Sequence, residues 1–133
     1  MNIIMTGSTS FVGAATVREL LRRGHTVTAI VRPKSSKLDT ILEGNEEALL
    51  SGRLLVIEND LSEPERLLEK VTKPQDVFCH FGWGGSGSAS RTDKALQEKN
   101  MEISLRRSGQ RRLWDAANSC FQALRRSMEC IGI

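Results

Sequence analysis

The stretch Thr6-Gly7-Ser8-Thr9-Ser10-Phe11-Val12-Gly13 decides the fold of this chain. It directly follows the apolar run Asn2–Met5 and directly precedes Ala14 to Arg23, which the pattern predicts to be an amphipathic helix. Gly7 permits a tight turn, and Gly13 lets the helix lie close to the strand. Because the N–H groups and the dipole at a helix N-terminus attract anions, the stretch predicts a site for a dinucleotide pyrophosphate. The alternative is an ordinary strand-to-helix turn.

Strands and helices alternate from this point to about residue 105. The first helix carries apolar residues at helical spacing, and Gly24 ends it. These apolar residues are Phe11, Val12, Ala15, Val17, Leu20 and Leu21. Further strands are predicted over 25–31, 54–57 and 76–83, and further helices over 36–50, from Ser62 onward and over 91–105. Ser62 is the expected cap of its helix, with Pro64 in the first turn. A break in the helix 36–50 is expected near Gly44-Asn45.

This alternation predicts an α/β fold, a doubly wound parallel sheet of the NAD(P)-binding Rossmann-like kind. The expected strand order is 3-2-1-4, and the sheet is expected to be truncated after about four strands. Residues 1–105 form the partial dinucleotide-binding domain in this interpretation. The fourth strand would then have an unpaired edge, through which we expect dimerisation or aggregation.

The opening stretch resembles the T-G-x-x-G-x-x-G of the extended short-chain dehydrogenase/reductases, in particular the NAD-dependent epimerase/dehydratase group that acts on nucleotide sugars. Gly7, Ser10 and Gly13 fall on its three glycine positions, so Ser10 departs from the pattern. The Ser10 hydroxyl either donates a hydrogen bond to phosphate, or its Cβ crowds the site and weakens binding. The apolar run ending in His80-Phe81-Gly82 and the segment 99–105 also resemble this family.

The end of the second strand indicates which dinucleotide is bound. A carboxylate there would hydrogen-bond the adenosine ribose and favour NAD, whereas an arginine would pair with a 2′-phosphate and favour NADP. This chain has Arg32, with Lys34 and Lys37 close behind, and no acid until Asp39. NADP is therefore favoured over NAD. The alternative is that Arg32 stacks on the adenine or faces water.

The resemblance implies further contacts to the cofactor. Asp60-Leu61 matches the family's acid and apolar residue beside the adenine ring, although Asp60 has an alternative role as a loop residue before the next helix. Gly82 would let the backbone pass close to the cofactor ribose, and Asn100 would support the active-site region. His80 is expected to be a packed residue without a catalytic role. The predicted cofactor-binding residues are Gly7, Thr9, Ser10, Phe11, Val12, Gly13, Arg32, Asp60, Leu61, Phe81 and Gly82.

The residues that the family uses for proton transfer are not found. A hydride leaves a carbinol carbon only as its hydroxyl proton is taken, and the family uses Tyr-x-x-x-Lys for this. The chain has no tyrosine, so no catalytic residue is assigned. The predicted function is that of an NAD(P)-dependent epimerase/dehydratase-like protein, reduced to its cofactor-binding half, with a nucleotide-sugar substrate only in an intact relative. The alternative is a non-catalytic NADP-binding or regulatory module whose basic tail docks to a partner.

The tail 106–133 does not match the family pattern in this interpretation. Residues 105–133 hold six arginines against Asp115 and Glu129, and this excess accounts for the net charge of +3. One hypothesis is that the tail is out-of-frame translation of an epimerase/dehydratase gene. The other is a terminal helix, because apolar residues from Leu113 to Met128 recur at helical spacing. Nucleic-acid binding is not expected, because no aromatic residues are interleaved with the basic ones.

Composition predicts the setting of the protein. With 133 residues the chain is one domain in size. Its three cysteines are odd in number and lack C-x-x-C spacing, so neither a disulfide framework nor a metal site is expected. No stretch is long enough to cross a membrane, and no signal segment is recognised. We therefore expect a soluble protein of the reduced cytoplasm.

Overall fold

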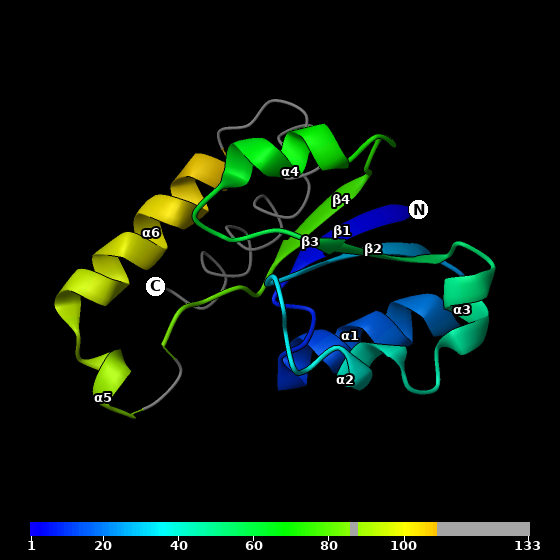
Figure 1. The fold of residues 1–133 in the computed structure, drawn as a ribbon, viewed down its shortest axis with the longest axis horizontal. Coiled ribbons are helices and arrows are strands. Elements are labelled where there is room, and N and C mark those ends of the chain that lie inside the picture. Colours follow the sequence, from blue (N-terminus) through cyan, green and yellow to red (C-terminus); the bar gives the residue numbers. More distant parts are fainter. Residues whose placement is uncertain (86–87, 109–133) are drawn as a thin grey trace, which may run out of the picture.

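Four parallel strands form one sheet in the order β3-β2-β1-β4, as the sequence predicts (Figure 1). The strands are β1 (Asn2–Thr6), β2 (Thr26–Val31), β3 (Leu54–Glu58) and β4 (Val77–His80). In register, Met5 of the central strand lies opposite Ala29 and Cys79. The computed structural model describes residues 1–85 and 88–108, so the predictions for the tail beyond 108 lie outside the described residues. Association of copies through the β4 edge stays a prediction.

Six helices are found among the described residues. They are α1 (Phe11–Arg22), α2 (Asp39–Leu42), α3 (Glu46–Leu50), α4 (Pro64–Lys70), α5 (Ser88–Arg91) and α6 (Lys94–Ser108). Figure 1 shows α1, α2 and α3 on one side of the sheet and α4 on the other. The chain therefore covers both faces of its parallel sheet, as a doubly wound fold requires.

Three of the predicted helices differ from the observed ones. The segment 36–50, predicted as a helix with a break, consists of two helices, α2 and α3. The expected break is confirmed, because Gly44 has a φ of +76°. The predicted helix 91–105 corresponds to α6, which begins three residues later than predicted, and the short helix α5 precedes it. Ser62 is not a cap, because its N–H and its hydroxyl both donate hydrogen bonds to the Asp60 carboxylate. Glu63 occupies the N-cap position of α4 instead.

The first helix begins three residues earlier than predicted, at Phe11 rather than Ala14. This start places Phe11 and Val12 in the first turn, where their side chains are 94% and 57% exposed. These two residues therefore do not belong to the core. Val17 and Leu21 do, and the helix ends as expected where Gly24 adopts a φ of +82°.

The two faces of the sheet bury very different amounts of apolar surface. On the α1 side, eleven buried residues form one cluster that includes Met5, Val17 and Ile41. On the α4 side the buried cluster consists of Ile4, Ile30, Leu67 and Phe78. Since burial of apolar surface is the main stabilising contribution, the α1 side holds most of the stability of the described part.

An exposed cluster of charges on α1 gives the fold a testable acid sensitivity. Arg22 and Arg23 both lie 2.7 Å from the Glu19 carboxylate and lower the pKa of Glu19 from 4.5 to about 2, Arg22 contributing most. A lowered pKa in the folded state stabilises the protein above pH 4.5, and this stabilisation is lost as the pH falls toward 2. We expect urea unfolding to show that Glu19→Gln removes this part of the pH dependence.

The effect should be small and should weaken at high salt, since the groups are exposed. Glu47→Gln, at an exposed position of α3, is the matched control. Equal pH dependence in both variants would contradict the expectation.

Candidate functional site

The loop between β1 and α1 is held by close backbone contacts at its two glycines. Gly7 has a φ of +69°, and a Cβ at this position would overlap the carbonyl group of Phe81 and the N atom of Gly82. A Cβ on Gly13 would overlap the carbonyl oxygen of Gly7. The loop, the start of the helix and the end of β4 therefore approach so closely that side chains cannot fit between them.

Ser10 is the N-cap of α1, and its Oγ accepts a hydrogen bond from the N–H of Gly13 at 3.0 Å. The hydroxyl proton is not used in this bond. The next two residues, Phe11 and Val12, are at the first helical positions, where backbone N–H groups have no acceptor within the helix. The first turn contains no acidic residue. An anion can therefore be held here by backbone N–H groups and by the helix dipole.

Ser8 fixes this loop to the second strand. Its side chain is fully buried, and its hydroxyl donates to the carbonyl oxygen of Ile30 at 3.3 Å. Thr9 follows and is half-buried. The loop is therefore anchored to the carboxyl end of β2, the strand that leads to Arg32.

The chain after β2 forms a positively charged turn. The N–H of Ser35 donates to the carbonyl oxygen of Arg32 at 3.2 Å, with Pro33 and Lys34 between them. Lys34 has a φ of 56°, as the third residue of a type II turn does. Arg32, Lys34 and Lys37 are exposed and form no ion pair within residues 1–85 and 88–108.

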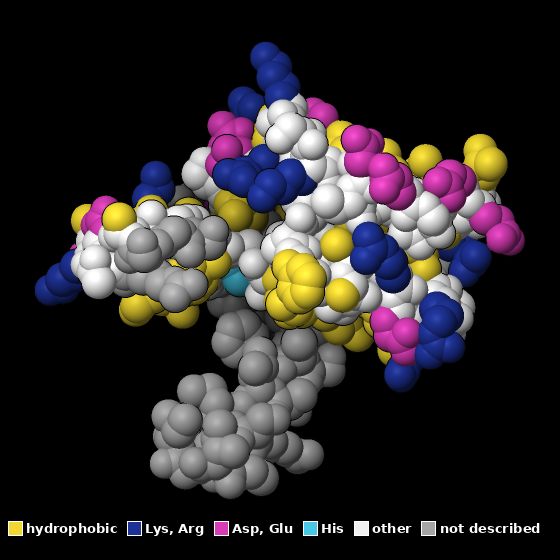
Figure 2. Space-filling model, turned by 90° about the horizontal axis from the view of Figure 1, so that it is seen from below, with side chains coloured by type: hydrophobic (Ala, Val, Ile, Leu, Met, Phe, Trp, Pro, Cys, Tyr) yellow, Lys and Arg dark blue, Asp and Glu magenta, His cyan; other side chains and the backbone are white. Residues whose placement is uncertain are grey.

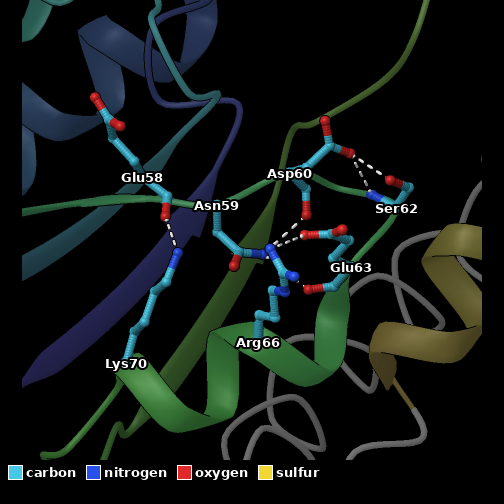
Figure 3. Close-up of polar contacts among 7 residues, drawn as sticks. All are labelled: Glu58, Asn59, Asp60, Ser62, Glu63, Arg66 and Lys70. Carbon is cyan, nitrogen blue, oxygen red and sulfur yellow. Dashed lines mark hydrogen bonds and ion pairs between the residues drawn. The ribbon is translucent and has the colours of Figure 1, made fainter.

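The loop after β3 is organised by hydrogen bonds within the loop itself (Figure 3). The Asn59 side chain is buried and donates through Nδ2 to the carbonyl oxygens of Asp60 and Glu63, at 2.8 and 3.0 Å. The exposed Asp60 carboxylate accepts from Ser62 at 2.6 and 2.8 Å. The alternative structural role of Asp60 is thus present, and its adenine contact stays a prediction.

A chain of side-chain hydrogen bonds joins β1, β4 and α6. Thr6 Oγ1 lies 2.5 Å from His80 Nδ1, and His80 Nε2 lies 3.0 Å from Ser104 Oγ. Since Ser104 donates to the Asn100 carbonyl oxygen at 2.9 Å, we assign the His80 proton to Nε2. The buried Asn100 side chain bonds both the N–H and the carbonyl oxygen of Gly84, at 3.0 and 2.9 Å. Asn100 thereby holds the loop at Gly84, and its support of an active site stays a prediction.

Gly82 lies where the loops after β1, β3 and β4 meet. A Cβ at this position would lie 2.9 Å from Leu61 Cδ1 and 3.2 Å from Thr6 Oγ1. The N–H of Phe81 donates to the carbonyl oxygen of Thr6 at 3.0 Å. The structure therefore brings Gly82 together with two other predicted site residues, Gly7 and Leu61.

Exposed apolar side chains border the site. Figure 2 shows hydrophobic side chains gathered on the α1–α3 side of the molecule, with Lys and Arg side chains around them. Phe11, Val12, Phe81 and Trp83 are between 40% and 94% exposed. These side chains supply apolar contact surface beside the anion site for the uncharged parts of a ligand.

Sequence reasoning found the loop glycines but missed several residues that position them. Ser8 and Thr6 are buried polar residues whose partners lie in other strands, and Asn59 is a buried polar residue whose partners lie within its own loop. The signal in the sequence that indicates such residues is a polar residue at the carboxyl end of a predicted parallel strand. Arg32 follows the end of β2, and Asp60 follows the end of the neighbouring strand β3. These two strand ends are joined by a hydrogen bond from the N–H of Asn59 to the Val31 carbonyl oxygen at 2.9 Å. The binding roles of the predicted residues stay predictions.

The fold and the loop define a Rossmann-like α/β domain. The sequence model of the NAD dependent epimerase/dehydratase family matches residues 3–123, and the chain belongs to this family. The match extends beyond residue 105, into the tail that the sequence pattern alone sets apart from the family.

Known proteins are similar to the chain in structure or, over a short stretch, in sequence. UDP-glucose 4-epimerase from Stenotrophomonas maltophila, with bound NAD and formylated UDP-arabinopyranose, is 19% identical over 87% of the chain, with a TM-score of 0.67. A carbonyl reductase from Pseudomonas aeruginosa PAO1 is 20% identical over 87% of the chain, with a TM-score of 0.62. The chloroplastic divinyl chlorophyllide a 8-vinyl-reductase of Oryza sativa subsp. indica is 54% identical over 33 residues, a quarter of the chain.

The chain is short relative to these proteins. It spans 34% of the Stenotrophomonas epimerase, 56% of the carbonyl reductase and 8% of the rice reductase. Within the described residues, no helix has both the length and the apolar character needed to cross a membrane.

Proposed function

We propose that the chain binds a nicotinamide dinucleotide, with the pyrophosphate on the loop from Gly7 to Gly13. The supporting observation is the N-terminus of α1, where a serine cap and two close-packed glycines leave the N–H groups of Phe11 and Val12 for an anion. Gly7, Thr9, Ser10, Phe11, Val12 and Gly13 form this part of the site. In this arrangement Ser10 caps the helix and its hydroxyl proton donates to phosphate.

The positive turn after β2 favours NADP over NAD in this proposal. Arg32 takes the position at which a carboxylate would bind an unmodified ribose, and a guanidinium matches the geometry of a phosphate. Asp60 and Leu61 lie beside the adenine, and Phe81 and Gly82 lie beside the ribose on the nicotinamide side.

The test is isothermal titration of the chain with NADPH and with NADH. Arg32→Ala should weaken NADPH binding about tenfold, since it removes a charged hydrogen bond, and should leave NADH binding nearly unchanged. Arg22→Ala, at the other end of α1, removes the same charge and is the control. An equal loss for both dinucleotides would remove the argument for NADP, and no binding of either would overturn the proposed function.

The whole protein is proposed to be an epimerase/dehydratase that acts on a nucleotide sugar by hydride transfer. The chain of 133 residues supplies the cofactor-binding part, and because it has no tyrosine it does not contain the family's proton relay. The lack of tyrosine also favours a second candidate, a non-catalytic NADP-binding module with a basic docking tail. An assay of the whole protein with the dinucleotide and a nucleotide sugar separates the two candidates, because only the enzyme converts the sugar.

A further inference from the structure

The indole ring of Trp83 is held in one orientation and is nevertheless half exposed. Its Nε1–H donates to Gln97 Oε1 of α6 at 2.8 Å, and Gln97 Nε2 donates in turn to the Ser90 carbonyl oxygen at 2.8 Å. The Trp83 side chain is 52% exposed, and within residues 1–85 and 88–108 no aromatic ring stacks on it. An apolar ring that is oriented through its N–H and uncovered on its face is suited to a flat ligand.

The backbone on each side of Trp83 is fixed to a different element. The N–H of Gly82 lies 3.4 Å from Thr6 Oγ1, at the carboxyl end of β1. Gly84 exchanges two hydrogen bonds with the side chain of Asn100 on α6, at 3.0 and 2.9 Å. Trp83 therefore lies between the end of the central strand and α6. Because both of its neighbours in the chain are glycines, neither has a side chain that could cover the indole.

The strand order places Trp83 at the nicotinamide end of the proposed dinucleotide site. Arg32 and Asp60 follow β2 and β3, which lie on one side of β1, whereas β4 lies on the other. A pyrophosphate at the loop after β1 joins two nucleosides. With the adenosine beside Arg32 and Asp60, the second nucleoside extends over the end of β4. Trp83 is three residues beyond that end, where the chain leaves the sheet toward α5 and α6 (Figure 1).

We propose that the indole of Trp83 stacks on the nicotinamide ring and favours the oxidised over the reduced dinucleotide. This inference rests on the proposed function. The nicotinamide ring is a cation in NADP⁺ and neutral in NADPH. A cation over an indole face gains an electrostatic attraction in addition to stacking, and a neutral ring gains stacking alone. The oxidised form is also the one that takes a hydride from a carbinol, as the proposed reaction requires.

The first experiment is isothermal titration of the chain with NADP⁺, NADPH and adenosine 2′,5′-bisphosphate, which lacks the nicotinamide. Trp83→Ala should weaken NADP⁺ binding about tenfold and NADPH binding about threefold, and should leave the bisphosphate unchanged. Leu50→Ala is the matched control, because Leu50 is an 89% exposed apolar residue of α3, which precedes the amino end of β3. The control should bind all three ligands as the parent chain does.

Fluorescence gives a second measurement on the unaltered chain. The chain has two tryptophans, Trp83 and Trp114. A nicotinamide cation stacked on an indole quenches its emission, so NADP⁺ should quench the parent chain. Trp83→Phe should lose most of this quenching but keep most of the affinity, since a phenyl ring also stacks. Equal quenching in the parent and in Trp83→Phe would contradict the proposal, and this comparison still decides if Trp83→Ala fails to fold.

The titrations separate failure of this inference from failure of the proposed function. An unchanged NADP⁺ affinity in Trp83→Ala would overturn the inference and leave the proposed function intact. Equal losses for NADP⁺ and NADPH would overturn the preference for the oxidised form, and an equal loss for the bisphosphate would show that the variant disturbs the adenosine side instead, which also overturns the inference. No binding of any of the three ligands to the parent chain would overturn the proposed function itself, and the inference with it.

Discussion

Gly7→Ala is expected to destabilise the chain by about 3 kcal/mol or more and to abolish dinucleotide binding. Two effects add: alanine is strained at a φ of +69°, and its Cβ overlaps the backbone of Phe81 and Gly82. Because these contacts are with backbone atoms, rotation of a side chain cannot relieve them. Urea unfolding measures the loss of stability, and isothermal titration with NADPH measures the loss of binding.

Gly44→Ala is the matched control for this substitution. Gly44 has a φ of +76°, but a Cβ at this position meets no atom within 4 Å. The control should therefore cost only the conformational strain, about 1 kcal/mol, and should leave NADPH binding unchanged. Equal losses in the two variants would show that the close approach of the loop to the end of β4 contributes nothing.

Asn100→Asp is expected to be the second most damaging change, with a loss of about 2–3 kcal/mol at neutral pH. The substitution keeps the shape of the side chain but replaces the Nδ2 donor to the Gly84 carbonyl oxygen by a second oxygen. Position 100 is only 6% exposed, so water cannot compensate. The loop around Gly84 should loosen as a result. Thermal melts of the variant and the parent chain measure this.

The loss in Asn100→Asp should depend on pH in a defined direction. Burial and the nearby carbonyl oxygen raise the pKa of the introduced carboxyl above its unfolded value of about 3.9. Below that pH the protonated carboxyl donates to Gly84 and the variant should approach the parent in stability. As the pH rises above about 3.9, the free energy of unfolding of the variant decreases, and this decrease ends once the carboxyl is ionised in the folded state as well. Asn45→Asp removes a single donor, to the Ile41 carbonyl oxygen, and is the control. A loss independent of pH would contradict the explanation.

The strand order could be predicted because its causes are local and repetitive. Each strand is a short apolar run followed by a helix, and parallel strands joined by helices form one sheet with few possible orders. Gly7, Gly13 and Gly24 also appear as signals in the sequence, because positive φ angles and close approaches favour glycine.

The polar contacts of the site could not be predicted, because their partners are distant in the chain. Thr6 and His80 are 74 residues apart, and His80 and Ser104 are 24 apart. His80 was predicted to be a packed residue, and it is indeed half-buried, but nothing near it in the sequence indicates that it links two elements. Ser62 illustrates a competing local interaction: the preceding Asp60 bonds it, so it cannot cap α4.

The backbone of Lys34 has a consequence for the charge of the turn after β2. At a φ of 56° a glycine would have no steric penalty, whereas a lysine crowds its Cβ against the backbone at a cost of about 1 kcal/mol. The local backbone preference and the residue type therefore disagree at this one exposed position. Despite that cost, the folded chain has the ammonium of Lys34 two residues beyond Arg32. The second positive charge of the turn is therefore present in spite of the conformational preference of the backbone that carries it.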